Sequence, residues 1–517
     1  MNPVELSIFA NRIEAVCDEM GAALQRSAFS PNIRDRLDYS CAVFDADGLL
    51  CAQAAHIPVH LGSMAFAMKD IVSSIDWDDG DMVILNDPYM GGTHLPDVSV
   101  IAPVFIDGNL LGFVANRAHH ADIGAESPGS MPLSSSLDEE GVIIAPTKLV
   151  VNNAVNEPAL DQLMASMRNP VESRGDFSAQ IAANLRGRQR LTELIKQMGR
   201  DEYLTGLAAL NDYAEQLAMQ SFNVIPDGVY TFADVLDDDG IGDKDIVITI
   251  TMTVTGGSVM VDFEGTDPQV SGNVNCPLSV TAAAVFYVFR CLLPPQAPAC
   301  AGSFRPIELK APAGCLVNAT PPSAVAAGNV ETSTRIVDVV MGALSAAMPE
   351  QIPAASHGSM NNIAMGFVGD QQQQAWDYYE TIGGGMGAGA SSDGLDAVQT
   401  HMTNTLNTPI ESLEMSYPLR VIAYRIRRNS GGEGAHCGGD GLVREFEFLH
   451  SAQATILSER RSHAPWGLHE GQAGAVAKNS LNGNALASKV SLQLESGDRL
   501  CIQTAGGGGW GRSKTSS

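Results

Sequence analysis

Basic side chains are scarce in this sequence. Lys and Arg number 31 against 59 Asp and Glu in 517 residues, which gives a formal net charge of −28. Such an acidic surface repels the phosphates of nucleic acids and the headgroups of anionic lipids. We therefore expect neither a nucleic acid nor a membrane among the partners of this protein.

Cysteine pairs of the kind that bind zinc or form disulfides are also missing. The nine cysteines are odd in number and scattered, and no two of them form a Cys-x-x-Cys motif. This spacing disfavours a disulfide framework and a thiolate zinc site. Reduced thiols, as in cytosolic proteins, fit the pattern best.

Long hydrophobic runs are absent as well. The most apolar helical stretch, residues 278–293, is interrupted by Arg290 and is shorter than the roughly 20 residues that cross a bilayer. The N-terminal Met-Asn-Pro-Val-Glu has neither the basic start nor the apolar core of a signal peptide. We expect a cytoplasmic protein.

The sequence contains no complete nucleotide-binding motif. Gly383-Gly384-Gly385-Met386-Gly387 lacks the Lys-Ser/Thr ending of a phosphate-binding loop and the strand-then-helix setting of a dinucleotide fingerprint. These glycines are better interpreted as turn and close-packing positions. If the reaction uses ATP, we expect another chain to supply the ATP site.

The composition is that of a globular protein with ample core material, with 45% apolar and 17% charged residues. The length corresponds to roughly two to four domains. We expect a mixed α/β, multi-domain fold with mixed sheets, a central helical section and a glycine-rich, β-containing C-terminal third. The predicted regions are residues 1–155 (α/β, with the candidate metal site), 156–225 (helical), 226–380 (α/β) and 381–517 (glycine-rich and β-rich).

Hydrophobic periodicity predicts the main elements. Residues 3–29 have apolar side chains at three- and four-residue spacing and form a predicted amphipathic helix capped by Asn2. Residues 39–51 form a predicted hairpin. Further strands are predicted at 82–85, 98–105, 110–118, 443–449, 490–494 and within 226–265, and further helices within 160–222 and at 278–293.

The most informative segment is Asn86-Asp87-Pro88-Tyr89-Met90-Gly91-Gly92-Thr93-His94-Leu95-Pro96-Asp97. Two predicted strands flank a turn that holds His94 and Asp97 three positions apart. In a turn, this spacing brings an imidazole nitrogen and a carboxylate oxygen to one ion. The two glycines let the backbone approach closely, and Pro96 stiffens the turn.

A second pair of candidates, His119 and His120, ends a predicted strand about twenty residues later. Since side chains alternate along a strand, the two histidines face opposite sides and at most one of them is a ligand. A His/His/Asp set with open positions suits catalytic Zn²⁺, Mn²⁺ or Fe²⁺. Asp38 is a candidate fourth ligand.

His56 and His60 are further candidates for the same pocket. They have the i,i+4 spacing of a helix face, but Pro58 stands between them and favours a loop. We rank them below the other histidines.

A set of motifs extends over nearly the whole chain: Asp38-Tyr39-Ser40-Cys41-Ala42, Ala55-His56-Ile57-Pro58-Val59-His60-Leu61-Gly62, Asn86-Asp87-Pro88, Gly92-Thr93-His94-Leu95-Pro96-Asp97, Ala118-His119-His120-Ala121-Asp122-Ile123-Gly124, Glu380-Thr381-Ile382-Gly383-Gly384-Gly385, Thr403-Asn404-Thr405, Thr408-Pro409-Ile410-Glu411, Ser430-Gly431-Gly432 and Pro465-Trp466-Gly467. With these motifs the sequence resembles the hydantoinase B/oxoprolinase family. The family includes the second subunits of N-methylhydantoinase and caprolactamase, the C-terminal half of 5-oxoprolinase, and acetone and acetophenone carboxylase subunits. The sequence departs from the family pattern at Ala125, 389–391 and His436-Cys437, and these departures leave the metal motif intact.

The resemblance implies a division of labour between two subunits. An A-type partner with ATP and Mg²⁺ phosphorylates the carbonyl oxygen of a small cyclic amide, and this chain opens the ring with a metal-activated water. The implied metal ligands are His94, Asp97 and His119, with Asp38 and His120 as neighbouring catalytic candidates. The implied assembly is a heterotetramer.

Two other functions stay open at this point. Family relatives also include carboxylase subunits, which join phosphorylated bicarbonate to a ketone enolate. A non-catalytic structural subunit is the third hypothesis, although the intact His94, Asp97 and His119 speak against it.

Overall fold

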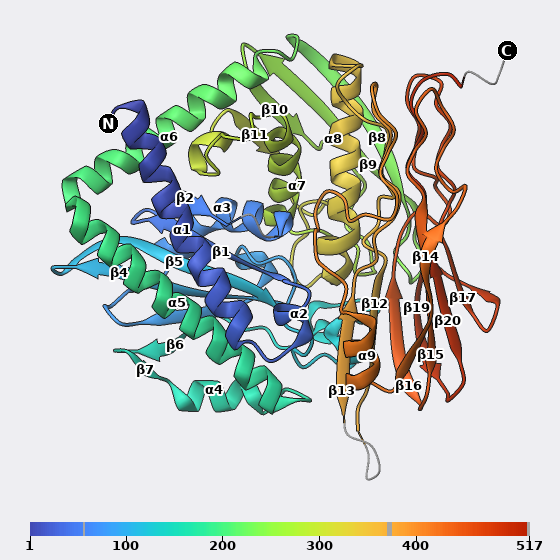
Figure 1. Cartoon of the computed structure of the whole chain (residues 1–517), viewed down its shortest axis with the longest axis horizontal. Helices are drawn as coiled ribbons and strands as arrows, with labels where there is room; N and C mark the ends of the chain where they lie inside the picture. Colours follow the sequence, from blue (N-terminus) through green and yellow to red (C-terminus); the bar gives the residue numbers. More distant parts are fainter. Residues whose placement is uncertain (55–56, 370–374, 514–517) are drawn as a thin grey trace.

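A computed structural model describes residues 1–54, 57–369 and 375–513 of the chain. The fold is mixed α/β, as predicted, and these described residues form four sheets. Figure 1 shows the helices of the N-terminal half on the left and the C-terminal strands on the right. No helix within these described ranges is both long and apolar enough to cross a membrane.

The first sheet carries the predicted metal motif. Its strand order is β2-β1-β5-β4-β3-β6-β7, and all of its neighbouring strands are antiparallel. The predicted hairpin and the strands at 82–85, 98–105 and 110–118 are confirmed here within one or two residues. The strands are β1 (Tyr39–Asp45), β2 (Leu50–Gln53), β3 (Met82–Leu85), β4 (Asp97–Ile106), β5 (Asn109–His119), β6 (Thr147–Val151) and β7 (Ala154–Val155).

Helices cover both faces of this sheet. The predicted N-terminal helix is α1 (Pro3–Ser27), and a capping box of Asn2 and Glu5 fixes its start. It packs beside α5 (Pro170–Met198) on one face, where Val43 and Val114 point. The opposite face, with Phe44 and Phe113, packs against α3 (Pro58–Ser73). The remaining helices of the predicted helical section are α4 (Glu157–Met164) and α6 (Arg200–Phe222).

The second sheet is mixed. Its order is β11-β10-β9-β8, with β10 and β11 parallel and the other pairs antiparallel. Two largely buried helices share its apolar core: the second packs on β8 and β9, and the first packs on the second and on α3. The elements are β8 (Gly228–Asp238), β9 (Lys244–Thr255), β10 (Ser258–Asp262), α7 (Leu278–Cys291), β11 (Ile307–Lys310) and α8 (Ser333–Ala347).

The C-terminal third packs two antiparallel sheets around a shared apolar core that includes Ile363, Phe446 and Ile502. The strand orders are β13-β12-β16-β19 and β14-β15-β20-β17-β18. The short α9 (Ile410–Ser416) lies near β13 in Figure 1. The strands are β12 (Asn362–Phe367), β13 (Trp376–Glu380), β14 (Leu419–Arg427), β15 (Gly441–Phe448), β16 (Ala452–Leu457), β17 (Lys478–Leu481), β18 (Asn484–Leu486), β19 (Lys489–Leu494) and β20 (Arg499–Gln503).

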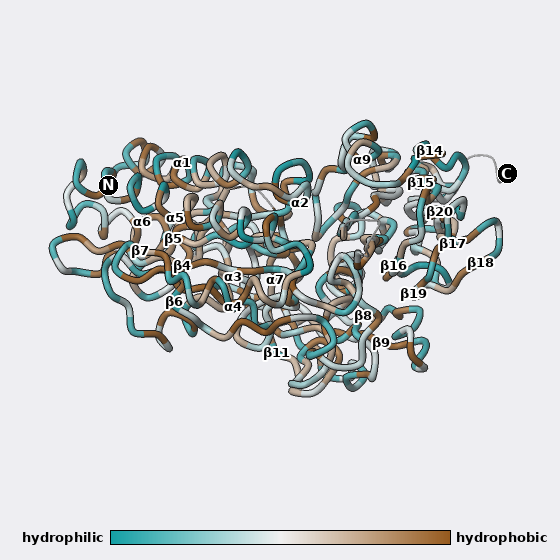
Figure 2. The backbone as a smooth tube through the Cα atoms, turned by 90° about the horizontal axis from the view of Figure 1, so that it is seen from below, coloured by the Kyte–Doolittle hydropathy of each residue, from teal (hydrophilic) through white to brown (hydrophobic). Residues whose placement is uncertain are grey.

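The glycine clusters of this third pack backbone against backbone, in agreement with the close-packing interpretation. A Cβ atom on Gly385 would lie 1.9 Å from the Gly439 carbonyl oxygen and 2.4 Å from the Gly507 nitrogen. Only glycine permits this approach between segments far apart in the sequence. In Figure 2, hydrophobic colour is concentrated on interior strands such as β4, and hydrophilic colour is frequent in outer turns.

Candidate metal centre

The predicted ligands His94, Asp97 and His119 converge at one end of the first sheet. Asp97 begins β4, His119 ends β5, and the two are paired directly across the antiparallel ladder. His94 lies in the turn before β4. All three side chains are buried, and one donor atom from each lies within 4.8 Å of the others.

The turn that carries His94 is held by local contacts. The Asn86 side-chain amide donates to the Leu95 carbonyl at 2.8 Å and accepts from the Ile144 amide at 2.7 Å. A Cβ atom on Gly92 would lie 2.6 Å from the Asp87 carbonyl oxygen, so the chain can fold back here only with glycine. The turn is therefore built before any ligand arrives.

The two carboxylate oxygens of Asp97 face different neighbours. Oδ1 lies 3.0 Å from His119 Nδ1 and 3.2 Å from His94 Nε2, and these two nitrogens are 3.3 Å apart. Ligand atoms bonded at about 2.1 Å to one divalent ion stand about 3.0–3.4 Å from one another. Oδ2 faces away from this triangle, accepts from Thr93 Oγ1 at 2.5 Å and lies 3.1 Å from His60 Nε2.

The polar atoms around the triangle fit a metal ion. His94 Nδ1 lies 3.2 Å from the Ala326 carbonyl oxygen, so this nitrogen donates and Nε2 presents its lone pair. Outside the triangle, the other ring nitrogen of His119, Nε2, and the cavity-lining Asn329 Oδ1 are buried without a hydrogen-bond partner among the described residues. A cavity of about 20 Å³ lies between these groups, which is room for one water-sized occupant. Two imidazoles and one carboxylate suit Zn²⁺, Mn²⁺ or Fe²⁺.

Electrostatics keep the Asp97 carboxylate charged. Burial opposes its ionisation, but the charges of His94 and His60 and the hydrogen bonds of His119 and His60 together hold its pKa well below the usual range. Burial lowers the pKa of His94, but the charge and hydrogen bond of Asp97 and the hydrogen bond to Ala326 together raise it. At His119 burial dominates and lowers the pKa. An ionised carboxylate next to a neutral His119 is ready to bind a cation, whose ligands must be deprotonated.

His60 belongs to the same cluster, and the prediction of a loop at Pro58 was wrong. Pro58 is the first residue of α3, where its missing N–H costs no hydrogen bond. The helix carries His60 to the cavity, where its Nε2 lies 4.0 Å from Asp38 Oδ1 and its Nδ1 lies 3.4 Å from Ser40 Oγ. Asp38 lines the cavity, and His56 lies outside the described residues.

The structure does not bring His120 to this cluster. As the alternation of a strand requires, His119 faces the α3 side and His120 faces α5. The His120 ring stacks on Phe177 at 4.5 Å, and its Nε2 lies 3.0 Å from Gln180 Oε1. Burial lowers the pKa of His120. The sequence left open which of the two histidines is a ligand, and the side of the sheet that each one faces favours His119 as the candidate.

Sequence reasoning missed two residues that contact the ligands from distant parts of the chain. Asn329 Nδ2 lies 3.3 Å from Asp97 Oδ2. The Tyr379 ring stacks on His119 with 4.5 Å between centroids and 19° between planes. The signal for Asn329 is weak: it is a polar residue in a largely apolar stretch, and such residues are more often partnered core groups.

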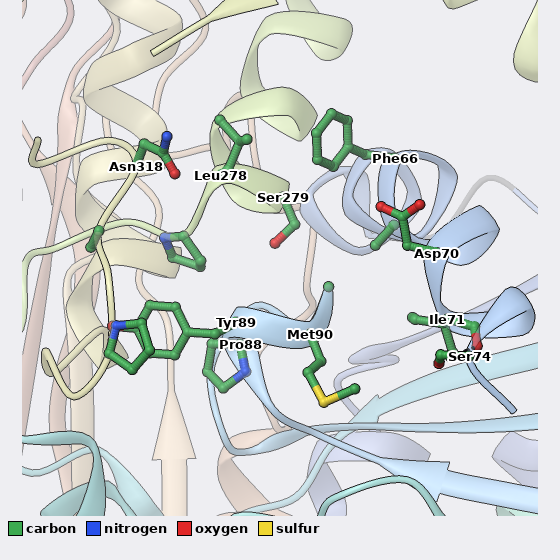
Figure 3. Close-up of a pocket in the computed structure, with 15 residues that line it drawn as sticks. Phe66, Asp70, Ile71, Ser74, Pro88, Tyr89, Met90, Leu278, Ser279 and Asn318 are labelled. Atoms are coloured by element: carbon green, nitrogen blue, oxygen red, sulfur yellow. Dashed lines mark hydrogen bonds between the residues drawn. The ribbon is translucent and has the colours of Figure 1, made fainter. Parts of the chain in front are cut away.

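A larger pocket of about 560 Å³ opens on the outer side of the same turn. In Figure 3, Tyr89 and Met90 border it on one side, Leu278 and Ser279 on another, and Phe66 and Asp70 on a third. It contains none of the three ligand candidates. The small cavity at Asp97, which gathers the imidazoles and carboxylates, is therefore the better candidate for the chemistry.

Comparisons with known proteins identify the family of the chain. The family model for hydantoinase B/oxoprolinase matches residues 2–513. The chain is 39% identical to 5-oxoprolinase 1 of Arabidopsis thaliana, with 98% of this chain but 42% of that protein covered. It is 33% identical to a Pseudomonas protein assigned as a D-/L-hydantoinase component, with 99% and 90% covered. The chain thus spans about two fifths of the plant relative and nearly all of the bacterial one.

Solved structures show the same fold. The ATP-dependent caprolactamase of Pseudomonas jessenii has a TM-score of 0.91 at 27% identity, with 99% of this chain and 91% of that chain covered. An acetone carboxylase structure has a TM-score of 0.89 at 19% identity, with 99% and 76% covered, and at this identity the likeness is one of fold alone. The family match across residues 2–513 and the identity to these relatives show that the chain belongs to the hydantoinase B/oxoprolinase family.

Proposed function

We propose that this chain is the metal-binding subunit of an ATP-dependent cyclic amidase that opens a hydantoin, oxoproline or lactam ring. One observation carries the proposal: His94, Asp97 and His119 converge in a buried cavity. The family supports the substrate class, because the relatives include a 5-oxoprolinase and a caprolactamase.

In this proposal the chain's own residues prepare the cavity for a reaction at a carbonyl. His94, Asp97 and His119 would hold the divalent ion, which would supply Lewis-acid chemistry and lower the pKa of water. His60 and Thr93 bind the far oxygen of Asp97 and orient its near oxygen toward the imidazoles. Asp38, on the cavity wall beside His60, is the proposed proton acceptor.

His120 has a different role in this proposal from the one that the sequence predicted. It is buried on the α5 side of the sheet, between Phe177 and Gln180. There it positions the end of β5, and we do not count it among the catalytic residues.

The proposal needs a partner that handles ATP. The sequence has no complete nucleotide motif, and more than half of the Arabidopsis 5-oxoprolinase lies outside the match to this chain. An A-type ATP-binding subunit is the proposed source of ATP and Mg²⁺, and it would phosphorylate the carbonyl oxygen before ring opening. The proposed assembly is a heterotetramer of two chains of each kind.

Ring hydrolysis is favoured over ketone carboxylation by the relatives. The cyclic-amide relatives are up to 39% identical, whereas the acetone carboxylase is 19% identical and supports the fold only. A structural subunit would have no use for a cavity that gathers an ionised carboxylate and three imidazoles.

The test is to purify the chain together with its A-type subunit and to assay hydantoin, 5-oxoproline and caprolactam with and without ATP. We expect ATP-dependent ring opening by the complex, loss of turnover in His94→Ala, and no turnover by either subunit alone. Ring opening by this chain without ATP would contradict the shared reaction. Bicarbonate-dependent consumption of a ketone would indicate the carboxylase instead, and full activity of a metal-free His94→Ala complex would indicate a structural subunit.

A further inference from the structure

A π-helix, η5 (Gly328–Thr332), lies directly beside the candidate metal centre. The Ser333 amide, the first of α8, donates to the Gly328 carbonyl five residues back. All five residues of η5 are buried. A single wide turn of this kind is rare and is frequently found at functional sites.

The start of η5 packs closely against the backbone of a neighbouring loop at Asn275. A Cβ atom on Gly328 would lie 1.8 Å from the Asn275 carbonyl oxygen, so only glycine allows this contact. The Asn275 side-chain amide also donates to the Ala324 carbonyl at 3.1 Å, just before η5 begins. The wide turn therefore has a fixed position relative to the cavity.

One side chain of η5 reaches the carboxylate of the site. Asn329 Nδ2 lies 3.3 Å from Asp97 Oδ2, the oxygen that faces away from the imidazoles. Its Oδ1 is buried without a partner among the described residues, and the residue lines the cavity. Asn329 thus adds a third contact to the Oδ2 oxygen that His60 and Thr93 already hold.

A second side chain of η5, Glu331, is linked to His119 through Asn362 and Tyr379. Glu331 Oε1 accepts from the Asn362 side-chain amide at 2.7 Å, and Asn362 Oδ1 accepts from the Tyr379 hydroxyl at 2.5 Å. The Tyr379 ring then stacks on His119 at 4.5 Å. The Arg36 guanidinium also lies over this ring and donates to the Tyr379 carbonyl oxygen at 2.7 Å.

We infer that η5 is a positioning clamp for the metal ligands, in which Asn329 orients Asp97 and Glu331, through Asn362 and Tyr379, fixes the ring plane of His119. This inference rests on the proposed function for the presence of a metal. It goes further by naming residues outside the ligand set that decide how well the ion is held. Partners that orient metal ligands typically change metal affinity 10–100-fold when they are removed.

The sharpest test removes one hydroxyl. Tyr379→Phe keeps the ring that stacks on His119 and cuts its hydrogen bond to Asn362. Tyr378→Phe is the matched control, because Tyr378 is the preceding residue of β13, is equally buried, and donates its hydroxyl to Glu380 Oε2 at 2.6 Å. Both variants lose one buried tyrosine hydrogen bond, but only the first belongs to the clamp.

The measurement is cobalt binding to the purified chain, by chelator competition and by the visible absorption of Co²⁺. We expect Tyr379→Phe and Asn329→Ala to bind Co²⁺ about 10–100-fold more weakly than the wild type, with a shifted absorption spectrum. Tyr378→Phe is expected to match the wild type in both. If Tyr379→Phe and Tyr378→Phe bind Co²⁺ alike, with the same spectrum, the clamp is refuted while the metal centre stands. A wild-type chain that binds no Co²⁺ would overturn the metal centre itself.

Discussion

Two buried polar clusters of this protein balance their charges in different ways. The Asp97 cluster comprises His60, His94, Asp97 and His119, in which imidazoles surround the carboxylate. The Glu459 network comprises Arg335, Asp338, Glu459, Arg460 and Lys489, in which each cation has a carboxylate partner. The separations there are 2.6 Å for Lys489–Glu459, 2.5 Å for Arg460–Asp338 and 3.4 Å for Arg335–Glu459.

The difference separates a structural cluster from a candidate functional one. Full charges in a core need opposite charges, and the Glu459 network supplies them between α8 and the C-terminal strands. The Asp97 cluster has a cavity and a carboxylate whose neighbours are imidazoles, which carry a charge only when they are protonated. A divalent ion would supply a positive charge there that does not depend on this protonation. Burial of polar groups alone would not have distinguished the two.

The largest expected effect comes from breaking the Glu459 network. Lys489→Met removes the nearer of two cations from Glu459 and leaves it with Arg335 at 3.4 Å, which we expect to lower the free energy of unfolding by about 3–5 kcal/mol. Urea-induced unfolding of the metal-free chain measures this loss. The matched control is Lys478→Met, since Lys478 is exposed on β17, and its expected change is within about 0.5 kcal/mol. Equal losses in both variants would contradict a structural role for the network.

Removal of the metal is the next largest effect and concerns the Asp97 cluster alone. When the free metal concentration is 100 times its Kd, the bound metal is expected to stabilise the chain by about 2.7 kcal/mol, and a chelator is expected to remove this stabilisation. His94→Gln lacks one of the three ligands and is expected to bind little metal, so the chelator is expected to leave its free energy of unfolding unchanged. Urea unfolding with and without the chelator gives both values. A chelator effect that persists in His94→Gln would place the metal elsewhere.

Acid is expected to weaken the network through Asp234, which pairs with Arg460 at 2.8 Å. Burial raises the pKa of Asp234, but Arg460 and Arg335 outweigh it and lower the pKa from 3.8 to about 2. Between these values the unfolded chain binds more protons than the folded one, so stability is present above pH 4 and is lost as the pH falls toward 2. The expected loss is about 2 kcal/mol. Asp234→Asn is expected to lack this part of the pH dependence of urea unfolding.

Local patterns allowed much of the fold to be predicted. The helix at 3–29 and the strands around His94 and His119 follow from hydrophobic periodicity and turn residues, and the structure has them within a few residues. The helix α8 was missed although its residues have helical amphipathicity, and most of them, including Arg335 and Asp338, are buried. The start of α3 was missed because Pro58 suits a first turn as well as a loop.

The part of the site that could not be predicted comes from distant segments. Asn329 lies 232 residues from Asp97 in the sequence and contacts it from η5, the turn that leads into α8. Tyr379 reaches His119 from β13 of another sheet. Periodicity shows which face of a strand a residue occupies, but not which element will cover that face. The strand alternation separated His119 from His120, and only the covering helices show which of them faces Asp97.

The smallest expected effect sharpens this last distinction. His120→Gln loses a stacking contact with Phe177 and a hydrogen bond to Gln180, which we expect to cost about 1 kcal/mol of unfolding free energy. Its metal content is expected to equal that of the wild type, because the side chain lies on the α5 side of the sheet. His119→Gln, one residue earlier, is expected to lose the metal. Metal analysis of the two purified variants decides the matter, and a loss of metal from His120→Gln but not from His119→Gln would reverse the assignment.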